Sequence, residues 1–202
     1  MASITARRNQ EKIAESLYKD THFAKQEVIS LLEMYETLTK VKNDKMDRTK
    51  FRDILYNNFG LTEDILMDRV FRVFDEDNDG ILNMKEWVVG LSKFLKGTKQ
   101  EQMDYCFKVF DINGSGYISR EGIHHMLKDC MVKSSTEEDA EENVKELVEI
   151  AMKKMDTDRD GRVSQTDFKA AVTLDGLLLE VFGKCLPGKE EVDKFSQKLS
   201  CN

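Results

Sequence analysis

The sequence predicts an all-α protein in which four helix–loop–helix units pair into two lobes, with an extra helix at the C-terminal end. Three observations lead to this prediction. An acidic loop of twelve residues lies at 75–86, and related loops recur at 111–122 and 156–167. Apolar residues before and after each loop are spaced by three and four, which places them on one helical face. The single proline of the 202 residues, Pro187, suits a helical chain.

The loop at residues 75–86 has the pattern of an EF-hand calcium site. Carboxylates occupy positions 1, 3, 5 and 12, and position 7 adds a backbone carbonyl; these ligands are Asp75, Asp77, Asp79, Glu86 and Ile81. Gly80 at position 6 permits the sharp turn. Calcium is a hard cation that prefers oxygen ligands, and crowded carboxylates are costly unless a cation neutralises them. This loop is therefore the strongest predicted calcium site.

The loop at residues 156–167 carries four acidic side chains as well. Its candidate ligands are Asp156, Asp158, Asp160, Asp167 and the backbone carbonyl of Arg162. Position 12 is aspartate instead of glutamate, and this shorter side chain reaches an ion poorly with both oxygens. Losing one ligand oxygen moves a seven-coordinate site toward six, the number that magnesium prefers. We expect a less selective calcium site that can hold magnesium at rest.

The loop at residues 111–122 is incomplete. Its candidate ligands are Asp111, Asn113, Ser115 and the carbonyl of Tyr117. Position 12 is Gly122, and the nearest acid, Glu121, stands one residue early. The apolar positions on either side fix the frame, so the loop cannot simply be shifted. Either Glu121 or water would have to replace the missing ligand, and the sequence leaves open a weak calcium site or a silent loop.

A fourth, degenerate hand is expected at residues 39–50, which lie one 36-residue period before the first acidic loop. It has lost its ligands, because Val41, Asn43 and Lys50 occupy positions 3, 5 and 12. We expect this hand to be retained for packing and not to bind calcium. The apolar residues at position 8 should join the hands in pairs, first with second and third with fourth, through short β-bridges; these residues are Met46, Leu82, Ile118 and Val163.

The lobes are expected at residues 1–97 and 98–202. An apolar stripe after the last loop predicts the extra C-terminal helix; its members are Leu174, Leu177, Leu178, Val181 and Phe182. Two interpretations remain open for this stripe. It could pack on the C-terminal lobe as ordinary core, or it could fill a groove until calcium or a partner displaces it.

Composition excludes some classes of function. A net charge of −7 implies no general affinity for nucleic acid. The four cysteines have no metal-ligand spacing, and no catalytic constellation emerges, so an enzyme is not expected. The absence of a signal peptide or long apolar span predicts a cytoplasmic protein.

The chain resembles the neuronal calcium sensor class and, within it, is most similar to the calaxin family of outer-arm dynein sensors. The similarity is carried by residues 71–80, 110–114 and 181–188 and by the acidic insert at 133–143. The resemblance implies a calcium sensor that changes conformation and regulates ciliary and flagellar motility. It implies an outer-arm dynein heavy chain as partner, with tubulin as a second candidate, and a location in the axoneme.

One departure from the neuronal sensors bears on membranes. Ala2 stands where a myristoylated protein requires glycine, so no membrane anchor is expected. Two alternative functions remain: a calcium buffer that binds without opening, and a regulatory subunit of a phosphatase that resembles calcineurin B.

Overall fold

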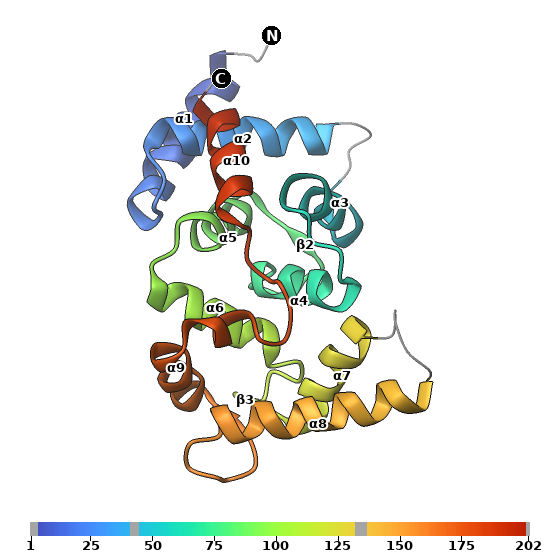
Figure 1. Cartoon of the computed structure of the whole chain (residues 1–202). Coiled ribbons are helices and arrows are strands. Elements are labelled where there is room, and N and C mark those ends of the chain that lie inside the picture. Colours follow the sequence, from blue (N-terminus) through green and yellow to red (C-terminus); the bar gives the residue numbers. More distant parts are fainter. Residues whose placement is uncertain (1–3, 41–44, 132–136, 201–202) are drawn as a thin grey trace. The chain divides into compact units, whose positions relative to one another are not determined.

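The computed structural model describes residues 4–40, 45–131 and 137–200 (Figure 1). The chain divides into two compact units. Unit 1 comprises Met1–Gly60, Phe71–Thr98 and Pro187–Asn202, and unit 2 comprises Leu61–Val70 and Lys99–Leu186. This division differs from the expected ranges 1–97 and 98–202 at residues 61–70, at residue 98 and at residues 187–202.

Unit 1 holds the degenerate hand and the first acidic loop. Its elements are α1 (Ile4–Leu17), η1 (Tyr18–Asp20), α2 (Lys25–Lys40), β1 (Met46–Asp47), α3 (Arg48–Phe59), β2 (Ile81–Leu82), α5 (Met84–Lys96) and α10 (Lys189–Ser200). The helix α4 (Asp64–Phe74) begins in unit 2 and contributes its last residues to unit 1.

Unit 2 holds the other two loops. Its elements are α6 (Lys99–Phe110), β3 (Tyr117–Ile118), α7 (Arg120–Met131), α8 (Glu137–Met155), β4 (Val163–Ser164), α9 (Gln165–Leu174) and the short 3₁₀ helix η2 (Gly176–Glu180). The all-α fold of paired hands predicted from the sequence is confirmed.

The exit helices begin at polar caps that lie at position 9 of their loops. Asn83 accepts hydrogen bonds from the amides at the start of α5, and Glu86 reaches back to the Asn83 amide, which completes a capping box. Ser164 and Asp167 form the same reciprocal pair at the start of α9. Each box satisfies backbone donors that a helix N-terminus leaves unpaired.

Short antiparallel bridges join the hands as predicted. Met46 stands opposite Leu82 in the bridge between β1 and β2. Ile118 stands opposite Val163 in the bridge between β3 and β4. All four side chains are fully buried, so each bridge fixes two loops side by side and closes the adjacent core.

Aromatic rings fill both cores. In unit 1, the Phe51 ring lies 4.8 Å from that of Phe74 and 6.3 Å from that of Trp87, measured between centroids. In unit 2, the ring of Phe110 contacts those of Phe168 and Phe182. These rings come from the helices on either side of the loops, so any rotation of those helices must repack the cores.

The position predicted for the C-terminal helix was wrong, although an additional helix is present. The α-helix stops at Leu174 because Asp175 takes an extended conformation and caps the amide of Leu177. Leu174 and Leu177 are 89% and 88% exposed. Phe182, by contrast, is buried in unit 2, as the packing interpretation expected for that residue.

The additional helix is α10, which follows Pro187 and packs in unit 1 against α2 and α3 (Figure 1). The ring of Phe195 lies 5.1 Å from that of Phe59. The hydroxyl of Ser30 donates to the carbonyl of Leu199 at 2.9 Å. Burial of Phe195 and Leu199 therefore fixes this helix to the unit that carries the first acidic loop.

Candidate calcium-binding loops

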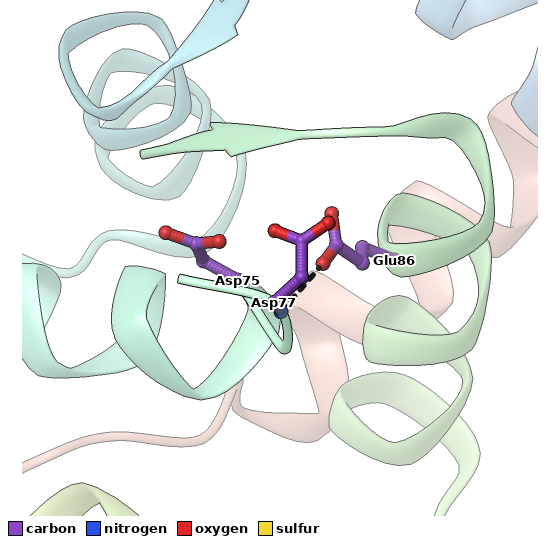
Figure 2. Close-up of side chains that lie close together, drawn as sticks. All are labelled: Asp75, Asp77 and Glu86. Carbon is purple, nitrogen blue, oxygen red and sulfur yellow. Dashed lines mark hydrogen bonds between the residues drawn. The ribbon is translucent and has the colours of Figure 1, made fainter. Parts of the chain in front are cut away.

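Three carboxylates converge in the loop at residues 75–86. Figure 2 shows Asp75, Asp77 and Glu86 gathered about one point, and a ligand oxygen of each lies within 4.8 Å of the others. Asp75 and Asp77 precede α5, while Glu86, the last residue of the loop, also lies in the first turn of that helix. This convergence of hard oxygen donors fits a calcium ion.

The loop backbone holds the first ligand in position. Asp75 accepts hydrogen bonds from the amide of Asp79 at 3.1 Å and from that of Gly80 at 3.0 Å. Gly80 has a φ of +82°, a conformation that a side chain would strain, as expected from position 6. The turn therefore fixes the orientation of the Asp75 carboxylate.

Glu86 is 6% exposed and binds the loop backbone with both oxygens. Its Oε1 accepts from the amides of Glu76 and Asp77 at 2.9 and 3.2 Å, and its Oε2 accepts from that of Asn83 at 2.9 Å. These bonds offset the cost of burying a charge. They also hold both oxygens beside the other carboxylates, where a bidentate ligand is needed.

The remaining predicted ligands of this loop are the Asp79 carboxylate and the Ile81 carbonyl. The Asp79 carboxylate accepts from the amide of Ile81 at 2.8 Å and is not part of the three-residue cluster. Ile81 itself lies in β2, opposite Asp47. Their roles as ligands stay predictions.

The loop at residues 156–167 also gathers three carboxylates. Ligand oxygens of Asp156, Asp158 and Asp160 lie within 4.8 Å of one another. Asp156 accepts from the amides of Asp160 and Gly161, the same arrangement as in the first acidic loop. The repeated geometry indicates a second place for a cation.

Asp167, at position 12 of this loop, lies outside that cluster. Its carboxylate is bound by the hydroxyls of Thr157 and Ser164 and by the amide of Ser164 at 3.0 Å. Burial alone would raise its pKa, but these hydrogen bonds outweigh burial and hold the pKa of Asp167 below its usual value. The shorter side chain is thus ionised but held away from the other three carboxylates.

The loop at residues 111–122 forms the same turn around a single carboxylate. Asp111 accepts from the amide of Ser115 at 3.0 Å and from that of Gly116 at 2.7 Å. Glu121 is exposed, and hydrogen bonds at the start of α7 lower its pKa. Among the described residues, no group of three acidic side chains converges here. The alternatives of a weak site and a silent loop remain, and the ligand roles of Asn113, Ser115 and Tyr117 stay predictions.

A lysine side chain occupies position 12 of the degenerate hand. The Lys50 ammonium, at position 12, donates to the carbonyl of Leu38 near the end of α2 at 3.4 Å. The Lys50 amide donates to Asp47, which caps α3. Val41 and Asn43 lie outside the described residues. A lysine where a calcium hand has glutamate supports the prediction that this hand binds no calcium.

Sequence reasoning missed two side chains that act on the 156–167 loop. Thr157 donates to Asp167, and the Arg162 side chain forms an ion pair with Asp160 at 2.8 Å. The sequence had indicated a role only for the backbone carbonyl of Arg162. A hydroxyl at position 2 and an arginine two residues after an aspartate were the available signals. A third missed residue, Arg69, contacts the 111–122 loop from α4, about forty positions away, where no local pattern could reveal it.

Comparison with known proteins agrees with this geometry. A family model for an EF-hand domain pair matches residues 63–128 and, again, residues 100–173. Calaxin of Xenopus laevis is 51% identical over 198 residues, which cover 95% of each chain. The chain belongs to the calaxin family. Calaxin of Danio rerio is 49% identical over 194 residues, 93% of this chain and 92% of the relative.

Membership of the calaxin family confirms the resemblance drawn from the sequence. A more distant relative is calcineurin B of Candida glabrata, which is 32% identical over 162 residues, or 80% of this chain and 88% of the relative. Calcium binding is the property that the EF-hand pairs imply for this calaxin-family chain. In the described part of the chain, no helix is long and apolar enough to span a membrane.

Proposed function

We propose that this protein is a calcium sensor that regulates outer-arm dynein in cilia and flagella. The observation that carries the sensor function is the position of the ligands at helix ends. Asp75 directly follows α4, and Glu86 lies in the first turn of α5. A cation held between these carboxylates therefore acts on both helices of the hand.

Calcium would supply two positive charges and accept oxygen ligands from Asp75, Asp77 and Glu86. Two side chains of this protein connect the ion site to the neighbouring helices. Glu86 binds the loop amides with both oxygens and lies in the first turn of α5, so a cation that it ligates acts directly on the start of that helix. Trp87, the next residue, is fully buried and donates from Nε1 to the carbonyl of Leu31 at 3.2 Å. Movement of α5 must therefore disturb the contact between α5 and α2.

The sensor and buffer functions predict different responses of Trp87. A sensor changes the environment of this buried indole, so calcium should alter its fluorescence and expose apolar surface to a dye. A buffer would bind the ion with neither change. The Glu86→Gln variant should lose both responses, because it keeps the shape of the side chain but loses its charge.

Family membership and the sequence resemblance support the partner and the location. We propose an outer-arm dynein heavy chain as the partner, tubulin as a second candidate, and the axoneme, reached through the cytoplasm, as the location. Calcium binding would change the affinity of this protein for dynein and so set the waveform of the cilium or flagellum. For the 156–167 loop we propose magnesium at rest, since Asp167 is held away from the three clustered carboxylates.

Pull-down from axonemal extract, with calcium or with a chelator, tests the partner. We expect dynein heavy chain in an amount that depends on calcium. The identity to calcineurin B keeps a phosphatase regulatory subunit as the second candidate function. Recovery of a phosphatase catalytic chain in place of dynein would favour that candidate.

A further inference from the structure

The guanidinium of Arg69 binds the end of α6 and the start of the 111–122 loop. Its Nε donates to the carbonyl of Val109 at 3.0 Å. Its terminal nitrogens donate to three further carbonyls at 2.6–3.1 Å, those of Lys108, Asp111 and Ile112. Arg69 is 9% exposed, and it belongs to unit 2 together with all four acceptors.

These bonds satisfy a need that the local structure creates. The last carbonyls of a helix have no partner within the helix, and α6 ends at Phe110. A guanidinium offers five N–H donors in a planar fork, and its positive charge suits the negative end of the helix. Burial of that charge is costly unless it is fully hydrogen-bonded. Arg69 and the start of the loop are therefore expected to move together.

Arg69 also belongs to the entering helix of the preceding hand. It lies on α4, which ends at Phe74, one residue before the first ligand Asp75. We infer that Arg69 couples the two loops, so that a change in α4 on ion binding at residues 75–86 is passed to residues 111–122 through its guanidinium. This inference rests on the proposed sensor function, because only a hand that moves its helices has a change to transmit.

The 111–122 loop is suited to receive such a signal. It lacks a carboxylate at position 12, so the placement of Asp111 decides how well it holds a cation. Arg69 binds the backbone carbonyl of Asp111, while the Asp111 carboxylate is left to face the loop and accepts from Ser115 and Gly116. Arg69 supplies no ligand oxygen. It acts as a positioning residue, and coupling must be reciprocal between the loops.

Amide resonances of two glycines provide separate reporters for the two loops. The Gly80 amide donates to Asp75 at 3.0 Å, and the Gly116 amide donates to Asp111 at 2.7 Å. The full chain would be titrated with calcium and followed by nuclear magnetic resonance in four forms: wild type, Asp75→Ala, Arg69→Met and the double variant. In the wild-type background, Asp75→Ala should move the calcium midpoint of the Gly116 resonance by at least about fivefold.

In the Arg69→Met background, the same Asp75→Ala change should move that midpoint less than about twofold. Arg72→Met is the matched control, because Arg72 is an exposed arginine on the same helix; coupling should persist there. Arg69→Lys keeps the charge without the planar fork and should retain only part of the coupling. It also serves as the test variant if Arg69→Met does not fold.

If Arg69 has only a structural role, Arg69→Met should lower the stability of the protein. The calcium midpoint of the Gly116 resonance should then still shift on Asp75→Ala. An equal effect of Asp75→Ala in every background would overturn the inference, as would no effect in the wild-type background. If the Gly80 resonance itself does not respond to calcium in the wild type, the proposed function fails, and the coupling fails with it.

Discussion

At the scale of single residues, position 12 distinguishes the three acidic loops. Glu86 lies in a cluster with two other carboxylates, and Asp167 accepts hydrogen bonds from hydroxyl groups. Gly122 has no side chain that could bind an ion. The chemistry of one side chain thus changes loops that otherwise share the same backbone turn. The sequence was sufficient to predict that the 111–122 loop gathers fewer carboxylates than the other two, because each position of the loop has a separate physical task.

Restoring the missing ligand should strengthen the middle loop. A Cβ added at Gly122 would meet only ordinary contacts, the nearest being the Ser119 hydroxyl at 3.5 Å. We expect Gly122→Glu to fold normally and to lower the calcium Kd of this loop by at least about tenfold. Calorimetry in a background with Asp75→Ala and Asp156→Ala isolates this site. Gly122→Gln is the matched control, and equal affinity for both variants would contradict the prediction.

A buried thiol gives the chain a pH dependence at the alkaline end. Burial, with a further contribution from Cys106, raises the pKa of the Cys185 thiol well above its usual range. The two sulfur atoms lie 3.4 Å apart. Because the folded state retains this proton longer than the unfolded state, Cys185 adds no pH dependence below the ordinary thiol pKa. Its contribution to the free energy of unfolding falls as the pH rises above that value.

Alkylation tests whether the Cys185 thiol is buried in the folded protein. The peptide containing Cys185 should stay unmodified by a thiol reagent at alkaline pH while the protein is folded, and it should react quickly in denaturant. Mass spectrometry of the digested protein identifies the peptide. Rapid modification of Cys185 in the folded protein would show that the thiol is not buried.

At the scale of elements, the helices beside the loops, the bridges between them and the presence of an extra C-terminal helix could be predicted, whereas the position of that helix could not. Repeated spacing around a loop of known length fixes both flanking helices. The stripe from Leu174 to Phe182 has helical spacing, but Asp175 and Gly176 end the helix, and no local signal showed that α10 packs in unit 1. That contact joins residues about 140 positions apart, such as Asn58 and Lys198.

Packing of α10 should contribute measurably to the stability of unit 1. Phe195 is 2% exposed and lies against Phe59. We expect Phe195→Ala to lower the free energy of unfolding by about 3–5 kcal/mol. Lys194→Ala is the control, because its ion pair with Glu190 is exposed to solvent and contributes little to stability. Denaturant unfolding compares the two, and similar midpoints would show that α10 does not stabilise the unit.

At the scale of the whole molecule, ion binding opposes an excess of negative charge. The net charge is −7, and two calcium ions in the loops with clustered carboxylates would bring it to −7 + 4 = −3. Ligands that bind only the folded state stabilise it, by about 2.7 kcal/mol for one site at a hundred times its Kd. We expect calcium to raise the unfolding temperature and a chelator to lower it. Equal unfolding temperatures under both conditions would contradict this.

Residues 75–86 are expected to take up calcium at signalling concentrations. Calorimetric titration of calcium into the wild type and into Asp75→Ala tests it most directly. We predict a site with a Kd of roughly 10⁻⁷–10⁻⁵ M in the wild type, and its loss in the variant. Identical binding isotherms for the two proteins, or no binding heat in the wild type over that range, would show that residues 75–86 are not the calcium site.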